Sequence, residues 1–244
     1  MSFSIVIPAL NEERYLPLLL QSIIATGIDD LDVIVVDGAS DDATQDVVRA
    51  FAETHRDRVS IRVFECETRN VSTQRNLGAA NALHDLIMFL DADVEIPDRE
   101  TFESLVASFR MEHCAAASCR FTPTDGHPIG RFYYWLAYRF HRFQERRKPY
   151  ALGACILTRK NVFERVGGFD ETIRVNEDAH YVERASRHGP FRVFPHALRT
   201  STRRFDKDGY VRMGARYVRI WLDRTFRGEL RDDRIKYEFG HYDS

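Results

Sequence analysis

Short apolar runs alternate with amphipathic stretches over roughly the first 95 residues. The apolar runs at 4–8, 32–37, 59–65 and 86–91 predict strands, and we expect the first and the fourth to be buried. Between them, apolar residues recur at helical spacing, and we expect helices over 11–27, from 42 into the low 50s, and over 70–84. This alternation of strand and helix predicts an α/β unit with a mostly parallel sheet.

Polar residues follow three of these predicted strands. Asn11 and Glu12 follow the first, Asp37 ends the second, and Asp91 and Asp93 follow the fourth. Ligands of an open parallel sheet bind at the carboxyl ends of its strands, so we expect these groups along one edge of the sheet, as a nucleotide pocket requires. If the chain stays extended, Asp91 and Asp93 point the same way and suit a hard divalent cation. A solvated acidic turn explains the pair equally well.

The second half of the chain has fewer clear patterns. Helical spacing of apolar residues predicts a core helix over 102–109, and strands are expected at 115–121 and 191–195. Residues 132–148 are aromatic and basic, and residues 209–227 are amphipathic and basic. Each segment can lie on a membrane surface as a peripheral contact, the first can also line an acceptor site, and either can be an ordinary packing helix.

Charge and cysteine content narrow the class of protein. The net charge is −12 over residues 1–119 and +10 over 120–244, so the second half can meet an anionic partner or simply attract the first half. The four cysteines lack metal-type spacing, which predicts reduced structural cysteines in a cytoplasmic protein. Residues 3–10 are too short for a signal peptide, and no apolar run approaches the ~20 residues of a membrane span.

Several common nucleotide-binding classes lack their motifs here. No Gly-x-Gly-x-x-Gly follows the first strand, and no Gly-x-x-x-x-Gly-Lys-Ser/Thr occurs. No nucleic-acid-binding motif is present, and we expect no nucleic-acid partner.

An ordered set of motifs covering about residues 4–205 resembles the inverting family 2 glycosyltransferases with the GT-A fold. The motifs are SIVIPALNEE at 4–13, VVDGASDDAT at 35–44, QRNLG at 74–78, FLDAD at 89–93, GAC at 153–155, FERVGGFDE at 163–171 and NED at 176–178. The resemblance implies one continuous α/β domain whose mixed, mostly parallel sheet is flanked by helices. Residues 1–95 would be its nucleotide-sugar-binding half, and residues 96–244 its acceptor-binding half with a basic tail.

The resemblance also implies donor-binding and metal-binding residues. A nucleotide-sugar and Mn²⁺ or Mg²⁺ would bind at Asp93, with Asp91 contacting ribose or assisting the metal. The other implied donor-binding residues are Pro8, Asn11 and Glu12 around the nucleoside, Asp37 at the base, and Arg75, Arg203 and Arg204 at the diphosphate. For Arg75, a surface ion pair is the alternative. His196 is either an additional metal ligand or a structural histidine.

The acceptor side is implied by the same resemblance. Asp178 is expected to be the catalytic base, with Glu177 orienting the acceptor hydroxyl or the base, and Asn176 is expected to cap their helix. Acidic residues also favour a helix N-terminus for dipole reasons alone. The Gln-x-x-Arg-Trp signature of processive synthases is absent, which favours a single transfer.

These expectations combine into one predicted activity. We expect a metal-dependent, inverting transfer of one sugar from a UDP- or GDP-sugar to a hydroxyl acceptor on a glycan, a glycolipid or a small molecule, in the cytoplasm or at the inner face of the membrane. A sugar nucleotidyltransferase and a non-catalytic nucleotide-sugar-binding module of the same fold are the alternatives. The first would need an arginine-bearing, glycine-rich loop after residue 8, which is absent.

Overall fold

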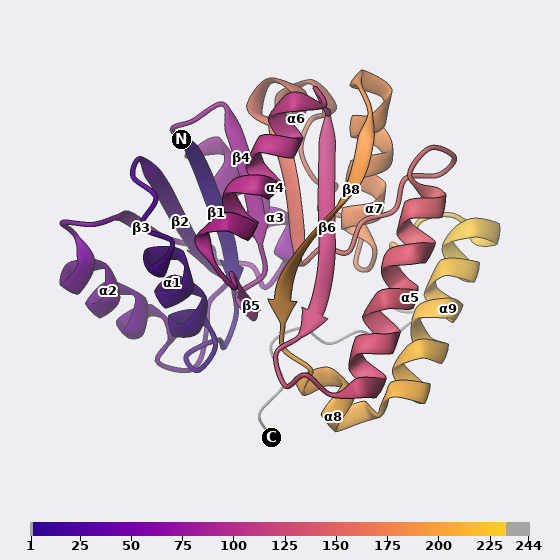
Figure 1. Ribbon diagram of the computed structural model, residues 1–244, viewed down its shortest axis with the longest axis horizontal. Helices are drawn as coiled ribbons and strands as arrows, with labels where there is room; N and C mark the ends of the chain where they lie inside the picture. Colours follow the sequence, from indigo (N-terminus) through magenta and orange to yellow (C-terminus); the bar gives the residue numbers. More distant parts are fainter. Residues whose placement is uncertain (1, 233–244) are drawn as a thin grey trace.

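A single eight-stranded sheet forms the centre of the protein (Figure 1). The structure is a computed structural model that describes residues 2–232. Its strands, in chain order, are β1 (Phe3–Ala9), β2 (Leu31–Asp37), β3 (Ser60–Glu65), β4 (Leu86–Leu90), β5 (Val94–Glu95), β6 (Ala116–Pro123), β7 (Cys155–Arg159) and β8 (Phe191–Thr200).

The strands follow the order β3-β2-β1-β4-β7-β6-β8-β5. β1 runs parallel to β2 and β4, and β2 parallel to β3, whereas β7 is antiparallel to both β4 and β6. β6 and β8 are parallel, and β5 pairs antiparallel with β8. The expected mixed, mostly parallel sheet flanked by helices is confirmed. The division into halves at residue 95 stays a prediction, and residues 233–244 of the second half lie outside the described residues.

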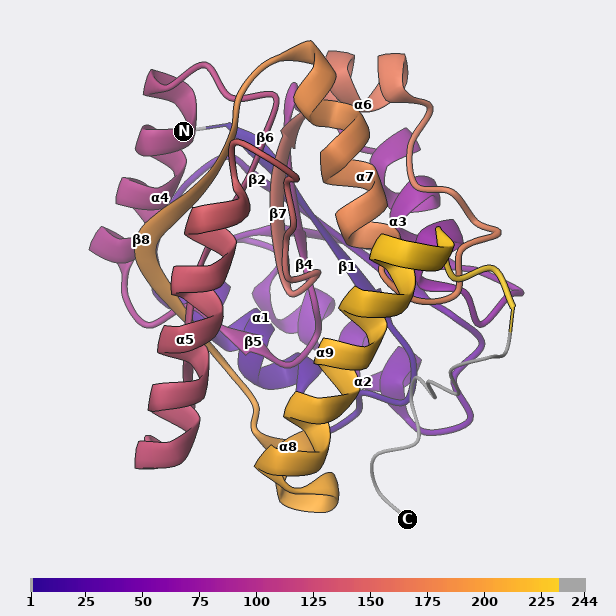
Figure 2. The same ribbon diagram turned by 90° about the vertical axis from the view of Figure 1, so that its right-hand side faces the viewer.

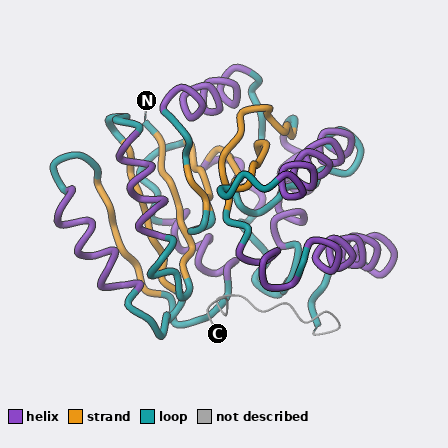
Figure 3. The backbone as a smooth tube through the Cα atoms, turned by 60° about the horizontal axis from the view of Figure 1, so that its bottom comes forward, coloured by secondary structure: helices purple, strands orange, loops and turns teal. Residues whose placement is uncertain are grey.

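Helices cover both faces of the sheet (Figure 3). The helices are α1 (Leu16–Ala25), α2 (Thr44–His55), α3 (Val71–Ala80), α4 (Arg99–Met111), α5 (Pro128–Gln144), α6 (Lys160–Val166), α7 (Glu177–Ala185), α8 (Arg203–Asp208) and α9 (Tyr210–Arg227). Because side chains alternate along a strand, one core forms against α1 and α4 and a second forms against α3, α6 and α7. The central strands β1, β2 and β4 are therefore buried on both faces.

The first helix begins later than its sequence pattern predicts. Asn11 has a left-handed backbone (φ 56°), and the carbonyl oxygen of Glu12 accepts hydrogen bonds from the amides of Tyr15 and Leu16. Residues 10–15 are therefore a loop, and α1 starts at Leu16. Its end is as predicted, because Gly27 takes the positive φ (58°) that terminates a helix.

Two helices from the second half of the chain lie side by side on one flank of the molecule. Figure 2 shows α5 and α9 there, in front of β4 and β7. The rings of Phe140 and Trp221 cross between them, with centroids 5.8 Å apart. Both segments were expected to be helical if structured, whereas β5 and the short antiparallel strand β7 were not predicted.

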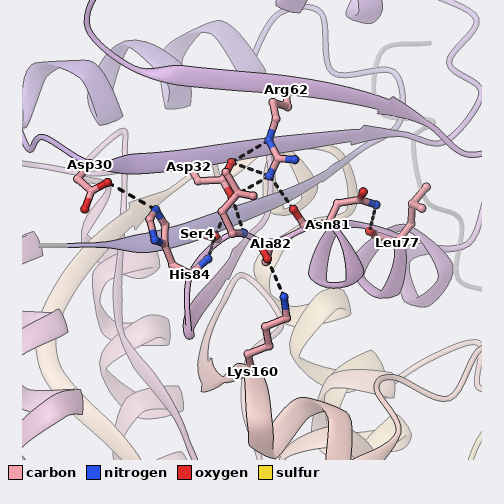
Figure 4. Close-up of polar contacts among 10 residues, drawn as sticks. Ser4, Asp30, Asp32, Arg62, Leu77, Asn81, Ala82, His84 and Lys160 are labelled. Carbon is pink, nitrogen blue, oxygen red and sulfur yellow. Dashed lines mark hydrogen bonds and ion pairs between the residues drawn. The ribbon is translucent and has the colours of Figure 1, made fainter.

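A half-buried ion pair between Asp32 and Arg62 lies at the end of the sheet where the parallel strands begin (Figure 4). The side chain of Asp32 accepts hydrogen bonds from Ser4 Oγ at 2.8 Å and from Arg62 Nε at 2.9 Å. Nη2 of Arg62 also donates to the carbonyl oxygen of Asn81 at 2.6 Å. Both carboxylate oxygens of Asp32 thus accept hydrogen bonds from within the fold. The carboxylates that face a cavity, Asp91 and Asp93, follow the opposite end of the sheet.

All four cysteines are buried and form no disulfide within the described part of the chain. Within residues 2–232, no helix combines the length and the apolar character needed to span a bilayer.

Candidate functional site

A cavity of about 810 Å³ opens where β1 and β4 end. Asp91, Asp93, Glu177 and Asp178 all line it, and its far wall is built by α5 and α9. The sequence expectation that the polar groups after β1, β2 and β4 share one edge is confirmed, because these strands are parallel neighbours. Carboxylates predicted for the donor side and for the acceptor side therefore face the same space.

Helix α3 approaches the sheet closely and carries the QRNLG motif. A Cβ atom at Gly78 would overlap Val6 of β1, so only glycine permits this approach. Gln74 then donates from Nε2 to the carbonyl oxygen of Ala9 at 2.9 Å. The side chain of Asn70 caps the helix by accepting from the amide of Ser72. These contacts fix the helix that brings Arg75 to the cavity.

Asp91 and Asp93 reach the cavity from a turn. The amide of Val94 donates to the carbonyl oxygen of Asp91 at 3.1 Å. The chain is therefore not extended at Asp91 and Asp93, as the sequence interpretation had assumed it to be. Both carboxylates nevertheless line the cavity. The turn, and not strand alternation, brings them together.

Arg75 connects the two groups of carboxylates. Its side chain is only 2% exposed, and it donates to Asp91 Oδ1 at 2.9 Å and to Glu177 Oε1 at 2.8 Å. Its guanidinium also lies over the ring of Phe169, 5.2 Å from the centroid. Burial opposes the charge, but Asp91, Glu177 and Asp178 outweigh it and raise the pKa of Arg75. The alternative of a surface ion pair is wrong, because both ion pairs of Arg75 are buried or half-buried.

Asp178 lies beside this network in the first turn of α7. Burial and the neighbouring charge of Glu177 raise the pKa of Asp178 to about 7, although Arg75 opposes the shift. Oδ1 of Asp178 accepts a hydrogen bond from the amide of Ala179 at 2.6 Å. A carboxylate that titrates near neutral pH and faces a cavity can exchange a proton with a bound hydroxyl group.

The expected side-chain cap by Asn176 is wrong. Asn176 has a left-handed backbone (φ 66°), and its side chain makes no capping hydrogen bond to α7. Oδ1 accepts instead from the hydroxyl group of Tyr150 at 2.8 Å. Tyr150 also lines the cavity and had no role in the sequence analysis, since an isolated tyrosine in a loop carries no pattern.

Gly153 is a second position whose role the sequence did not reveal. A Cβ atom there would lie 2.9 Å from Asp178 Oδ2 and 3.0 Å from Arg75 Nη2. The GAC motif therefore supplies the space in which these two side chains meet. The one sequence signal for Gly153 was that it belongs to the GAC motif, which is among the motifs that resemble family 2.

Arg203 lines the cavity and pairs with two carboxylates there. Its guanidinium pairs with Glu12 at 2.9 and 2.5 Å, and Nη2 lies 3.2 Å from Asp93 Oδ2. Burial raises the pKa of Glu12 to about 7, against the opposing effect of Arg203. Arg204 and Pro8 also line the cavity. Arg203, predicted for the diphosphate, thus lies against the carboxylate predicted for the metal.

Asn11 and Asp37 are not part of the cavity wall, and their side chains make hydrogen bonds within the loops that follow β1 and β2. Asn11 Oδ1 accepts from the amide of Asp41 at 2.8 Å. The buried carboxylate of Asp37 accepts from Gln45 Nε2 at 2.8 Å and from the amide of Ser40 at 3.1 Å. Their predicted contacts with the nucleoside stay predictions.

The structure does not bring His196 to the carboxylates. Its Nε2 lies 3.0 Å from Ser108 Oγ of α4, and the ring is not part of the cavity wall. Among the described residues, no group of three or more histidine, cysteine, aspartate or glutamate side chains could hold a metal by itself. A cation here would need ligands beyond Asp91 and Asp93.

The FERVGGFDE motif packs onto α3 through Asn76. Asn76 Nδ2 donates to the carbonyl oxygen of Phe169 at 2.9 Å, and its Oδ1 accepts from the amide of Phe169 at 2.8 Å. A Cβ atom at Gly168 would lie 2.6 Å from that same oxygen. The QRNLG and FERVGGFDE motifs are therefore in direct contact, and Phe169 of the second motif packs against Arg75 of the first.

Solved structures share this fold. The mannosyltransferase PcManGT from Pyrobaculum calidifontis, solved with GDP-Man and Mn²⁺, superposes with a TM-score of 0.69 at 23% identity, covering 90% of this chain and 65% of that one. TarS 1–349 of S. aureus, solved with UDP-GlcNAc, superposes with a TM-score of 0.65 at 21% identity, covering 82% and 58%. The fold is thus the predicted GT-A fold.

Sequence comparison gives the family. A PGL/p-HBAD biosynthesis glycosyltransferase of Mycobacterium bovis is 34% identical over 111 residues, which are 46% of this chain and 42% of that protein. The chain spans less than half the length of the curated relatives it matches. The model of glycosyl transferase family 2 matches residues 4–167, and the chain therefore belongs to that family.

Proposed function

We propose that this protein transfers one sugar, with inversion, from a UDP- or GDP-sugar to a hydroxyl acceptor. The observation that carries the proposal is that Asp178, with a pKa raised to about 7, faces the same cavity as Asp91 and Asp93. Inverting transfer needs a base on the side of the sugar opposite the departing diphosphate, and a single cavity lined by Asp178 as well as by Asp91 and Asp93 can hold the sugar between them. Complexes of two structural neighbours with GDP-Man and with UDP-GlcNAc support the choice of donor.

Asp178 removes the proton of the acceptor hydroxyl group in this proposal. The acceptor oxygen forms a bond to the anomeric carbon as the bond from that carbon to the diphosphate oxygen breaks. The electron pair of the broken bond leaves with the nucleoside diphosphate, and the proton stays on Asp178. Glu177, held by Arg75 at 2.8 Å, keeps the helix start and its base in place.

Arg203 and Arg204 bind the diphosphate in this proposal. The guanidinium of Arg203 pairs with Glu12 and Asp93 without donor, and a diphosphate would offer it alternative oxygen ligands. The nucleoside is framed by the loop that contains Pro8, Asn11 and Glu12, and its base is bound by Asp37.

A divalent cation fits the donor side when the donor supplies ligands too. Mn²⁺ and Mg²⁺ prefer oxygen, and Mg²⁺ in particular is often bound by one or two carboxylates together with substrate phosphates. Asp93, with Asp91 assisting, would hold it, and its charge would stabilise the diphosphate as it leaves. A neighbour that was solved with Mn²⁺ supports this assignment.

A thermal-shift screen tests the donor assignment. UDP- and GDP-sugars are added with and without Mn²⁺, since a ligand of the folded state raises the melting temperature. The sugar that binds is then used to follow release of nucleoside diphosphate. Binding without turnover with any hydroxyl acceptor would favour a non-catalytic module, and release of pyrophosphate from a nucleoside triphosphate would favour a nucleotidyltransferase.

A further inference from the structure

Exposed apolar side chains gather on one flank of the protein. Among the described residues, large apolar side chains with high exposure lie on α5 and α9, with the exceptions of Leu18, Leu83 and Met111. The α5–α9 face is defined by Ile129, Phe132, Trp135, Leu136, Phe140, Phe143, Val211, Val218, Leu222 and Phe226. Phe132 is 61% and Phe226 80% exposed, so the face leaves aromatic rings in water. Such a patch marks an interaction surface.

The same two helices are strongly basic. α5 contains three arginines and no acidic residue, and α9 contains five arginines and a single aspartate, Asp223. Asp223 is buried and pairs with Arg227 at 2.9 Å. Arg224 is buried between Glu183 and Glu229, and Arg216 pairs with Asp208, so these two add no charge to the surface. The other six arginines are exposed and, among the described residues, meet only Asp223 and Glu145 in ion pairs. The α5–α9 face therefore combines apolar side chains with a surplus of positive charge, which is complementary to an anionic, apolar surface.

The α5–α9 face continues into the cavity. Leu136 and Phe140 of α5, and Val211 and Val218 of α9, are exposed and also line the cavity that contains Asp178. Trp221 lies deeper on the same wall, against Phe140. An apolar path thus leads from the exposed flank to the proposed base.

We propose that the hydroxyl acceptor is carried by a lipid in an anionic bilayer, and that the protein docks on this bilayer through the α5–α9 face. The proposal rests on the proposed transferase function and names its acceptor class. The apolar rings enter the interface, the arginines meet anionic headgroups, and the apolar part of the lipid lies against the cavity wall. A second copy fits less well, because a two-fold contact would place one arginine-rich face against another.

Tryptophan fluorescence tests the docking directly. The chain has two tryptophans, Trp135 and Trp221, and both are on these helices. Vesicles of phosphatidylglycerol and phosphatidylcholine with brominated acyl chains should quench both, and should quench Trp221 alone in a Trp135→Phe variant. Vesicles of phosphatidylcholine alone should bind weakly, and added NaCl should release the protein from anionic vesicles.

A matched pair of variants locates the contact. Phe132→Ser with Phe226→Ser removes exposed rings outside the cavity wall, and binding to anionic vesicles should fall by about tenfold or more, since each ring that leaves water contributes substantially. The control is Leu83→Ser with Met111→Ser, whose side chains are 67% and 78% exposed elsewhere, and it should bind as wild type.

Donor binding, measured in parallel, separates the two proposals. If wild type binds the nucleotide-sugar but not anionic vesicles, the docking proposal is overturned and the transferase proposal stands. An equal loss of vesicle binding in the two pairs of variants would also overturn the docking proposal. So would light scattering that shows self-association of a protein that binds no vesicles. If no donor binds, the transferase proposal fails whatever the vesicles show.

Discussion

Arg75 and Glu177 lie 102 residues apart in the chain, and their side chains form a buried ion pair at 2.8 Å. The same guanidinium holds Asp91 at 2.9 Å. This arginine therefore ties the end of β4 to the start of α7, and so ties the proposed donor side to the proposed acceptor side. Losing one member of such a group leaves buried charges without a partner.

Arg75→Lys should destabilise the protein strongly. A lysine cannot reproduce the forked contact with two carboxylates, and we expect the free energy of unfolding to fall by about 2–4 kcal/mol. Urea unfolding followed by circular dichroism measures this. Arg49→Lys is the control, because Arg49 pairs with Glu65 on the surface and should change stability by less than about 0.5 kcal/mol. Equal losses in the two variants would contradict a bridging role for Arg75.

Gly153→Ala should disturb the same network by steric contact. The new Cβ atom would lie 2.9 Å from Asp178 Oδ2 and 3.0 Å from Arg75 Nη2, so one of these side chains must move. We expect transfer to fall at least about tenfold, since small displacements of a catalytic group are costly. Gly214→Ala is the control for folding, because its Cβ atom meets only Tyr133 at an ordinary 3.8 Å. A Gly153→Ala enzyme with wild-type turnover would contradict the predicted crowding.

The sequence predicted the strands of residues 1–95 more completely than the side-chain contacts at their ends. Apolar runs identified β1, β2 and β4, because a strand buried on both faces leaves a continuous apolar signal. The edge strand β3, which is only half-buried, was also identified. Strand β7 was missed, since it has only five residues and is followed directly by α6, and periodicity does not distinguish so short a run as strand or helix. Its antiparallel pairing with β4 nevertheless joins the strands β1–β4 to the remaining strands in one sheet.

For the site, too, the sequence identified residues but not their contacts. Glu12, Asp93 and Arg203 could each be named from motifs, but their mutual ion pairs depend on β8 delivering Arg203 to the end of β1. His196 has a metal ligand's chemistry and is placed against Ser108 by the register of β8. Asn176 is a good capping residue by type, yet its left-handed backbone and Tyr150 give its side chain another partner.

Asp178→Asn should abolish transfer and keep donor binding. Asparagine is similar in shape but cannot accept the proton, and removing a general base typically costs about 10²–10⁴-fold in rate. Calorimetry with the donor and a turnover assay separate the two effects. Asp57→Asn, at an exposed position in the loop before β3, is the control and should be unaffected. Near-normal turnover in Asp178→Asn would assign the base elsewhere.

The pH dependence of the enzyme should report the same carboxylate. Burial raises the pKa of Asp178 from 3.8 to about 7, and a base acts only when ionised, so kcat/KM should rise with pH through about 7. Between about pH 4 and 7 the folded protein holds a proton that the unfolded chain releases, so this site's contribution to stability falls as pH rises. Asp178→Asn should therefore melt higher than wild type at pH 8 and match it near pH 3. A pH-independent difference in melting temperature would argue against the raised pKa.

Asp93→Asn should remove the dependence of donor affinity on metal. Asparagine keeps the volume of Asp93 but loses the charge that would hold a cation and that now pairs with Arg203 at 3.2 Å. We expect wild type to bind its donor about 10–100-fold more tightly with Mn²⁺ than with a chelator, and the variant to bind equally weakly in both, because a neutral amide is a poorer ligand for a hard cation. Asp208→Asn, which removes a carboxylate paired with Arg216 outside the cavity, should keep the full metal effect. Titration calorimetry measures the donor affinity of all three proteins with Mn²⁺ and with the chelator. If wild type binds its donor as tightly in the chelator as in Mn²⁺, donor binding does not depend on the metal, and the pairing of Asp93 with Arg203 becomes the better account of this carboxylate.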